Sequence, residues 1–248
     1  YSIVFGAAAI VGPILIEPLV SSWGYEGLFY IIGTSYVLTV GTLMMMKTEG
    51  HKVASTSRTA IQGLLQGFSY LKNQRSISAV ILLGVTMGLF GSSFDTLLPV
   101  FADEIYETGL DVGGRLLLGA GIGGLIATTA ITLIGKRVRP ALYLLIAGLG
   151  LGSAQLIFSR IDVIAVAVIV AGFIGGFKVV LGTMNTTVVQ TLVDEEFRGR
   201  VMSINQLTWG ASALGGLLMG YMAERFDAPT AMTLGGAIAI LATILVGQ

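Results

Sequence analysis

Long runs of apolar residues, separated by short polar segments, recur along the whole chain. The clearest case surrounds residues 194–200, where five of the seven residues are charged. The run before it, Val163–Val193, contains one Lys and no acid, and the run after it, Val201–Ala223, contains no charge. A helix of about 20 apolar residues crosses the roughly 30 Å hydrocarbon core of a bilayer. The pattern therefore predicts a charged turn between two membrane-spanning helices, rather than a buried hairpin of a large soluble protein.

The same alternation of apolar and polar segments predicts eight membrane-spanning helices. An all-α, polytopic membrane protein is the expected fold class, because a helix satisfies its own backbone hydrogen bonds in lipid. The expected spans are residues 1–20, 27–46, 77–100, 113–134, 141–158, 163–193, 201–223 and 229–246.

The longest polar segment, residues 47–76, separates the second and third expected spans. Its second part carries apolar residues at helical spacing, which predicts an amphipathic helix lying on the membrane surface. These residues are Ile61, Leu64, Leu65, Phe68 and Leu71. The chain thereby divides into residues 1–46, a linker at 47–76 and residues 77–248.

Basic residues in the short loops are concentrated on one side of the expected spans. Ten Lys and Arg residues fall in loops on one side and three on the other. Loops rich in Lys and Arg remain in the cytoplasm. The expected location is the plasma (inner) membrane, crossed several times, with the linker and the C-terminus in the cytoplasm.

Composition narrows the class of protein. Of the 248 residues, 54% are hydrophobic and 11% are charged, whereas soluble domains typically carry about 25% charged residues. The 14 basic and 14 acidic residues cancel, so no nucleic-acid partner is expected. The chain has no Cys and a single His, and it shows no catalytic triad, metal-ligand spacing or phosphate-binding loop. We expect no enzyme activity, no cofactor and no metal; the expected partners are the lipid bilayer and a small-molecule substrate.

Two spans, a long linker with a surface helix and then six spans resemble a major facilitator superfamily transporter that lacks its first four helices. Gly12-Pro13 resembles the glycine–proline motif in the fifth helix of exporters of that family. Residues 194–200, followed by Val-Met-Ser, resemble the acidic-then-RGR turn of the branch that includes enterobactin exporters and macrolide efflux proteins. The resemblance implies helices five to twelve of a twelve-helix fold built from two halves. It also implies that the missing N-terminal helices of the same protein are a partner of this chain.

Four ionisable residues fall inside expected spans, where charge is costly and usually functional. Glu17, Asp95 and Arg115 each lie about one turn from the outer end of their span. Lys178 lies about 15 residues, or roughly 22 Å, from the outer end of its own span. Because these depths differ by about 15 Å, Asp95 and Lys178 are not expected to pair. The alternative for each of the four is a side chain that packs or extends to the headgroups.

The resemblance implies roles for these residues. Spans 77–100 and 163–193 would face a central cavity, which makes Asp95 the first candidate for proton coupling. Glu17, Lys178 and Asn185 are the other candidates for proton coupling or substrate binding.

Two gates are also expected. Spans 1–20 and 113–134 would meet between the halves, so Glu17 and Arg115 are expected to form an outer gate. Asp194, Arg198 and Arg200 are expected to close an inner gate, with a simple cytoplasmic anchor as the alternative. The pairs Gly119/Gly123 and Gly216/Gly220 have the spacing of helix-packing glycines.

Together these features favour a secondary active transporter that exports a small amphipathic molecule, of drug or siderophore type, by alternating access coupled to protons. A membrane scaffold or sensor that retains the fold without transport is the alternative. A membrane-embedded enzyme is a third, and the lack of a catalytic cluster argues against it.

Overall fold

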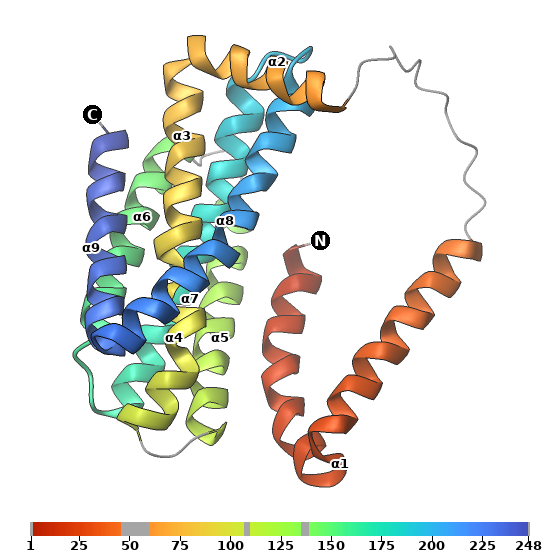
Figure 1. Cartoon of the computed structure of the whole chain (residues 1–248), viewed down its shortest axis with the longest axis vertical. Helices are drawn as coiled ribbons and strands as arrows, with labels where there is room; N and C mark the ends of the chain where they lie inside the picture. The colour runs from red at the N-terminus through yellow and green to blue at the C-terminus, as the bar shows by residue number, and fades with distance from the viewer. Residues whose placement is uncertain (1, 46–59, 107–109, 135–138, 248) are drawn as a thin grey trace.

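The computed structural model describes residues 2–45, 60–106, 110–134 and 139–247, and all regular structure in these ranges is helical (Figure 1). This confirms the all-α fold class. The elements are α1 (Ser2–Met45), α2 (Ala60–Asn73), α3 (Arg75–Thr86), η1 (Met87–Gly91), α4 (Ser93–Val100), η2 (Phe101–Ile105), α5 (Leu110–Ile134), α6 (Pro140–Phe158), α7 (Ile164–Leu192), α8 (Arg198–Arg225) and α9 (Ala228–Val246).

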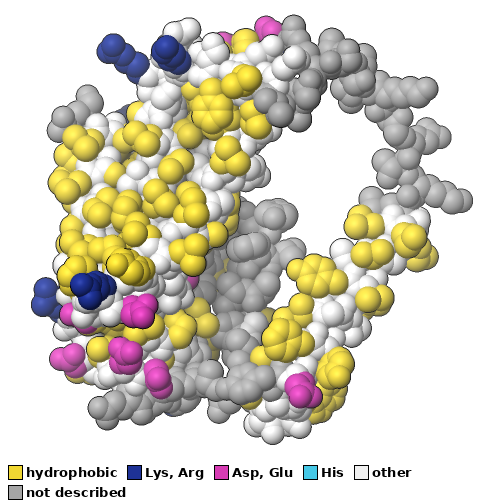
Figure 2. Space-filling model, in the orientation of Figure 1, with side chains coloured by type: hydrophobic (Ala, Val, Ile, Leu, Met, Phe, Trp, Pro, Cys, Tyr) yellow, Lys and Arg dark blue, Asp and Glu magenta, His cyan; other side chains and the backbone are white. Residues whose placement is uncertain are grey.

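Six helical segments in the described ranges are long and apolar enough to cross a membrane. They are Glu26–Met45, Arg75–Ile105, Val112–Ile134, Pro140–Phe158, Ile164–Leu192 and Ala228–Val246. The expected spans 1–20 and 201–223 form helices but are not among these six, so the count of eight stays a prediction. Apolar side chains cover the flank of the helical bundle seen in Figure 2, and charged side chains gather toward its two ends.

The first two expected spans form the two helical arms of α1, which are separated by a non-helical residue, Gly24. Gly24 has a φ of 66°, which a residue with a Cβ atom rarely adopts. Figure 1 shows the two arms of α1 diverging from this bend. The chain therefore bends sharply at Gly24, between the two expected spans.

The third expected span is longer than the sequence suggested. Helical structure runs from Arg75 to Ile105 through two π-helical segments, η1 and η2, instead of ending at residue 100. A π segment breaks the regular pattern of backbone hydrogen bonds, and buried carbonyls then need other donors. The Gln155 side-chain amide donates to the carbonyl of Gly91 at 2.8 Å, and the Ser93 hydroxyl donates to the carbonyl of Phe90.

Helices α5 and α7 approach closely because glycines face each other. A Cβ atom on Gly123 would lie 1.8 Å from the carbonyl oxygen of Gly172, and one on Gly175 would lie 2.0 Å from that of Ala120. This confirms a packing role for Gly119 and Gly123. Gly220 differs, because apart from its chain neighbours and the nearby backbone of its own helix, no described atom lies within 4 Å of the Cβ position there.

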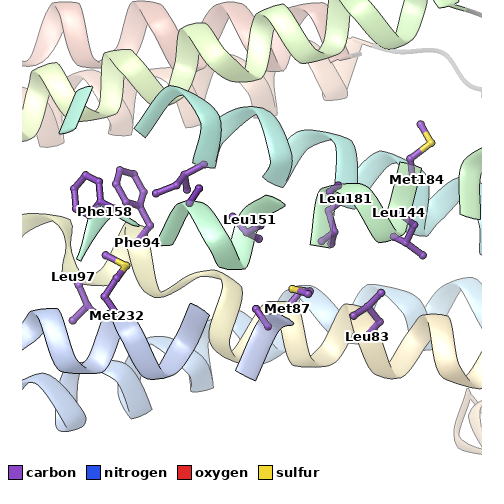
Figure 3. Packing of buried hydrophobic residues seen from close by; sticks show 14 of the residues in the cluster. Leu83, Met87, Phe94, Leu97, Leu144, Leu151, Phe158, Leu181, Met184 and Met232 are labelled. Atoms are coloured by element: carbon purple, nitrogen blue, oxygen red, sulfur yellow. The ribbon is translucent and has the colours of Figure 1, made fainter. Parts of the chain in front are cut away.

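A buried apolar cluster joins α3, α4, α6, α7 and α9 (Figure 3). At one end, the Phe94 and Phe158 rings meet edge to face at 5.1 Å, and the rings of Phe101 and Phe158 do so at 5.2 Å. Such pairs stabilise a core beyond the area that they bury. The cluster fixes α4, and therefore Asp95, against the rest of the bundle.

The linker helix α2 packs against the end of α8 (Figure 1). Leu71 is buried, whereas Leu65 and Phe68 are exposed. Gly67 allows the approach, because a Cβ atom there would lie 2.8 Å from Cδ1 of Ile204. A helix forms where the sequence predicts the amphipathic one, and its apolar side is divided between α8 and the surface. Its position on a membrane stays a prediction.

Helix α9 begins at a capping residue, Asp227, whose Oδ1 accepts a hydrogen bond from the Thr230 backbone N–H at 2.5 Å. That backbone hydrogen bond, with a second one from the Thr230 side chain, lowers the pKa of Asp227. Replacing Asp227 with alanine should destabilise the protein by about 1 kcal/mol, measured as a lower midpoint of thermal unfolding in detergent.

The capping contribution should also depend on pH. The folded-state pKa of Asp227 is lowered, so the stabilisation is present at neutral pH and is lost as the pH falls through that pKa. The variant Asp227→Asn keeps a capping oxygen and should unfold near the wild-type midpoint at neutral pH. Equal losses in the Ala and Asn variants would contradict a capping role.

Candidate functional site

An ion pair joins Asp95 on α4 and Lys178 on α7. The Lys178 Nζ donates to Oδ2 of Asp95 in an ion pair. The two side chains are 49% and 35% exposed, so the pair lies at an open face of the bundle. The structure thus brings together two of the four ionisable candidates.

The prediction that Asp95 and Lys178 do not pair is wrong. It rested on a third span ending at residue 100, whereas the helical path continues to Ile105. Asp95 therefore lies ten residues, or about 15 Å, from that end. Lys178 lies 14 residues, or about 21 Å, from the start of α7 at Ile164. The remaining difference of about 6 Å is within the reach of a lysine side chain.

Irregular backbone lies on both sides of Asp95. The π segment η1 ends at Gly91, and Pro99 follows four residues after Asp95 inside α4. Proline has no N–H to donate to the carbonyl four residues earlier, which here belongs to Asp95. Helices interrupted in this way are frequent at functional sites, and the sequence showed only Pro99 as a sign of it.

A pocket of about 120 Å³ lies beside Lys178. It is lined by residues of α3, η1, α7 and α8 and by Leu151 of α6, and it is open to the surface. Its polar lining residues are Ser92, Lys178, Asn185, Thr186, Asn205, Thr208, Trp209 and Ser212.

Two buried asparagines face this pocket and differ in their hydrogen bonds. Asn185 donates from Nδ2 to the carbonyl of Val80 at 2.8 Å, so this predicted site residue also ties α7 to α3. Asn205 is 2% exposed, and its Oδ1 has no hydrogen-bond partner in the described part of the chain. A buried carbonyl without a donor costs about 1–3 kcal/mol.

Sequence reasoning missed Asn205, Thr208 and Trp209 because it searched for ionisable residues, and α8 carries none between Val201 and Ala223 apart from Tyr221. The available signal was an asparagine in the middle of an uncharged span. Buried polar groups of this kind are costly unless they have partners.

The turn between α7 and α8 holds the linker helix. The Tyr70 hydroxyl donates to Oδ2 of Asp194 at 3.0 Å, and the Tyr70 ring stacks on Phe197 at 4.5 Å. Arg200 also lies against Phe197, with its guanidinium 5.3 Å from the ring centre.

The second arginine of the turn, Arg198, lies 3.8 Å from Glu195. Such an exposed pair contributes little to stability. The inner gate formed by Asp194, Arg198 and Arg200 stays a prediction.

The predicted outer gate falls on two helices that pack together, α1 and α5. Arg115 is exposed on α5, whereas the side chain of Glu17 lies outside the described residues. The same holds for Pro13, and Gly12 has open space at its Cβ position. The Glu17–Arg115 gate and the Gly12-Pro13 motif therefore stay predictions.

No cluster of three or more His, Cys, Asp or Glu side chains that could hold a metal ion is found among the described residues. The polar groups that the structure brings together at the site are the Asp95–Lys178 ion pair and the lining of the adjacent pocket.

Comparisons with known proteins identify the family. The model of the Major Facilitator Superfamily matches residues 1–214. The multidrug efflux pump Tap of Mycobacterium tuberculosis is 24% identical over 229 residues, which are 90% of this chain and 54% of that protein. The staphyloferrin A transporter of Staphylococcus aureus is 27% identical over 157 residues, 62% of this chain and 39% of that protein. The chain spans about half the length of the Tap pump that it matches.

The fold is also that of a solved transporter. The crystal structure of a mutant of the nucleoside transporter NupG superposes with a TM-score of 0.69 and 17% sequence identity, covering 99% of this chain and 65% of that one. At that identity the likeness concerns the fold alone. The family model, by contrast, matches most of the sequence, and this chain therefore belongs to the Major Facilitator Superfamily.

Proposed function

We propose that the protein is a secondary active transporter that exports a small amphipathic molecule by alternating access, coupled to protons through Asp95. The observation that carries the proposal is the Asp95–Lys178 ion pair on membrane-spanning helices. Charged groups at such positions are expensive and mark ion or substrate pathways. A scaffold without transport has no need to bear that cost.

The similarity to efflux pumps supports export as the direction of transport. Several are multidrug efflux pumps, and we infer that this protein likewise moves its substrate outward, in exchange for protons that enter the cell. In this role, Asp95 takes up a proton on one side of the membrane and releases it on the other. The Asp194–Arg200 turn and the Glu17–Arg115 pair would close the cytoplasmic and outer ends in alternation.

Replacing Asp95 with asparagine should remove the pH dependence of export and reduce its rate at least tenfold, because the amide cannot load a proton. The measurement is efflux of a fluorescent dye from cells or proteoliposomes that contain the intact transporter, at external pH values between 6 and 8. Asp103→Asn is the matched control, since Asp103 is exposed on η2, two turns beyond Asp95. If Asp95→Asn kept the wild-type pH profile, the coupling role would pass to Glu17 or to another carboxyl group.

A further inference from the structure

We propose that Gln155 of α6 is a positioning residue, which holds the break between η1 and α4 and thereby sets the rotation of α4 that brings Asp95 to Lys178. The ion pair is part of the structure, so this inference does not depend on proton coupling. Its effect on export rests on the proposed function, which gives Asp95 a role in transport. Gln155 acts through the backbone of Gly91, to which it is hydrogen-bonded.

Gln155 is a buried amide in an apolar core. Its side chain is fully buried, and its Nε2 donates to the carbonyl of Gly91 at 2.8 Å. A carbonyl can only accept, so the amide nitrogen is the atom that must face it. The Oε1 atom has no hydrogen-bond partner in the described part of the chain, which costs free energy. An apolar side chain would fill this space without that cost, so the amide serves the bond to Gly91 rather than packing.

The bond falls where the helix is interrupted. The π segment η1 ends at Gly91, and Ser92, the residue before α4, has a ψ of 4°, outside the α-helical range. A backbone hydrogen bond at this junction, from the Thr96 N–H to the Ser92 carbonyl, is 3.5 Å long, whereas about 2.9–3.0 Å is usual. The backbone bonding is therefore weak here, and the hydrogen bond from α6 fixes the geometry of the junction.

The geometry of the junction decides where Asp95 points. Asp95 follows Gly91 by four residues, which is about one helical turn. A π segment closes its hydrogen bonds over five residues instead of four, so it takes up one extra residue. Each residue of an α-helix turns the chain by about 100° and advances it by about 1.5 Å. If η1 relaxed to α-helical geometry, α4 would turn by about 100° and carry Asp95 away from Lys178.

Helix α6 supports this bond firmly, because it packs tightly against α9. A Cβ atom on Gly152, three residues before Gln155, would lie 2.6 Å from the carbonyl oxygen of Gly236. Helix α6 also meets α4 through Phe158, whose ring packs against that of Phe94 (Figure 3). Burial of apolar surface is non-directional, whereas a hydrogen bond is directional. Of these two contacts with the η1–α4 segment, the Gln155 bond is the one that selects a single backbone carbonyl, and hence one rotation of α4.

The test is chemical labelling of Lys178 with an amine-selective acylating reagent, read by mass spectrometry on the purified intact transporter. An ammonium paired with a carboxylate reacts slowly, because the neutral amine is the reactive form and the carboxylate stabilises the charged one. Gln155→Met keeps a similar side-chain volume and removes the donor, so it should raise the labelling of Lys178 about fivefold. Asp95→Asn opens the pair directly and should raise the labelling at least as much. Adding Gln155→Met to Asp95→Asn should change nothing further.

Two controls separate positioning from packing. Leu144→Ala removes a buried side chain of the same helix, about three turns before Gln155. It should lower the midpoint of thermal unfolding and leave the labelling of Lys178 unchanged. Lys72 is exposed on α2 and should be labelled equally in every variant. If Gln155→Met does not fold, Gln155→Asn takes its place, because its amide is one methylene shorter and no longer reaches Gly91.

Export by the intact transporter gives a second measurement, which a packing role would not move in the same way. Gln155→Met and Lys178→Met should each slow the initial rate of export, by about fivefold for Gln155→Met. Because both variants lose the same contact, the double variant should be no slower than Lys178→Met alone. Losses that multiply would mean that Gln155 acts on export by another route, and the inference would be wrong.

The labelling also separates this inference from the proposed function. Unchanged labelling of Lys178 in a folded Gln155→Met protein would overturn the inference, and so would a further rise when Gln155→Met is added to Asp95→Asn. Raised labelling in Gln155→Met, together with wild-type export and pH profile in Asp95→Asn, would support the positioning role and refute the proposed coupling role of Asp95.

Discussion

Replacing Gly123 with alanine is expected to lower the midpoint of thermal unfolding in detergent by about 10 °C or to prevent folding. The added Cβ atom would lie 1.8 Å from the Gly172 carbonyl oxygen, far inside contact distance. That oxygen belongs to the backbone of α7, so the strain cannot be relieved by rotating a side chain. Overpacking costs about 1–3 kcal/mol and sometimes more, and each kcal/mol shifts the midpoint by about 2–4 °C at this size.

The matched control for Gly123 is the same substitution at Gly220. Alanine stabilises a helix interior by about 0.5–1 kcal/mol relative to glycine. Apart from its chain neighbours and the nearby backbone of α8, no described atom lies within 4 Å of the Cβ position of Gly220. Gly220→Ala should therefore leave the midpoint unchanged or raise it. A wild-type midpoint for Gly123→Ala would show that α5 and α7 do not pack as closely as the structure has them.

Exchanging the charges of Glu17 and Arg115 is expected to restore export that either single change impairs. The two residues lie on helices that pack together, α1 and α5, and opposite charges at matching depth attract each other. Because Arg115 is exposed, we expect a coupling of about 1 kcal/mol, at the upper end for exposed pairs. That value corresponds to about a fivefold change in export rate.

The experiment compares initial export rates of Glu17→Gln, Arg115→Gln, both together, and the exchange Glu17→Arg with Arg115→Glu. Each single variant should be impaired, the double variant should be no worse than either, and the exchange should recover part of the rate. Surface abundance of each variant is the control for folding. Losses that add, with no recovery in the exchange, would mean that the two side chains act separately.

The repeating apolar runs determined the helices of this protein. Each predicted span has a helical counterpart in the structure, because a segment in lipid must satisfy its backbone hydrogen bonds within itself. The spacing of Gly119 and Gly123 likewise indicated a close helix crossing, because small residues four apart lie on one face of a helix. The order of spans and linker, with the turn at residues 194–200, was enough to indicate the family.

The linker helix shows what sequence patterns cannot predict, which is the place where a helix attaches to the rest of the fold. Helical periodicity predicted α2, but its attachment to the α7–α8 turn depends on Tyr70 and Asp194, which are 124 residues apart. Local spacing carries no information on a contact at that distance. The exposed Leu65 and Phe68 show the same limit, since the apolar face did not reveal which part α8 would cover.

The sequence by itself determined that Asp95 and Lys178 are ionisable groups in apolar helices, but only the tertiary structure decided that they pair. The pairing depends on where the third span ends and on its two π segments. The spacing of residues in the sequence predicted neither feature. The burial of Asn205 Oδ1 without a hydrogen-bond partner among the described residues is likewise a property of packing, since the surrounding helices enclose that oxygen. A helix forms because a segment in lipid must satisfy its own backbone hydrogen bonds. The partner of a side chain depends instead on the depth and rotation of helices that are distant in the chain.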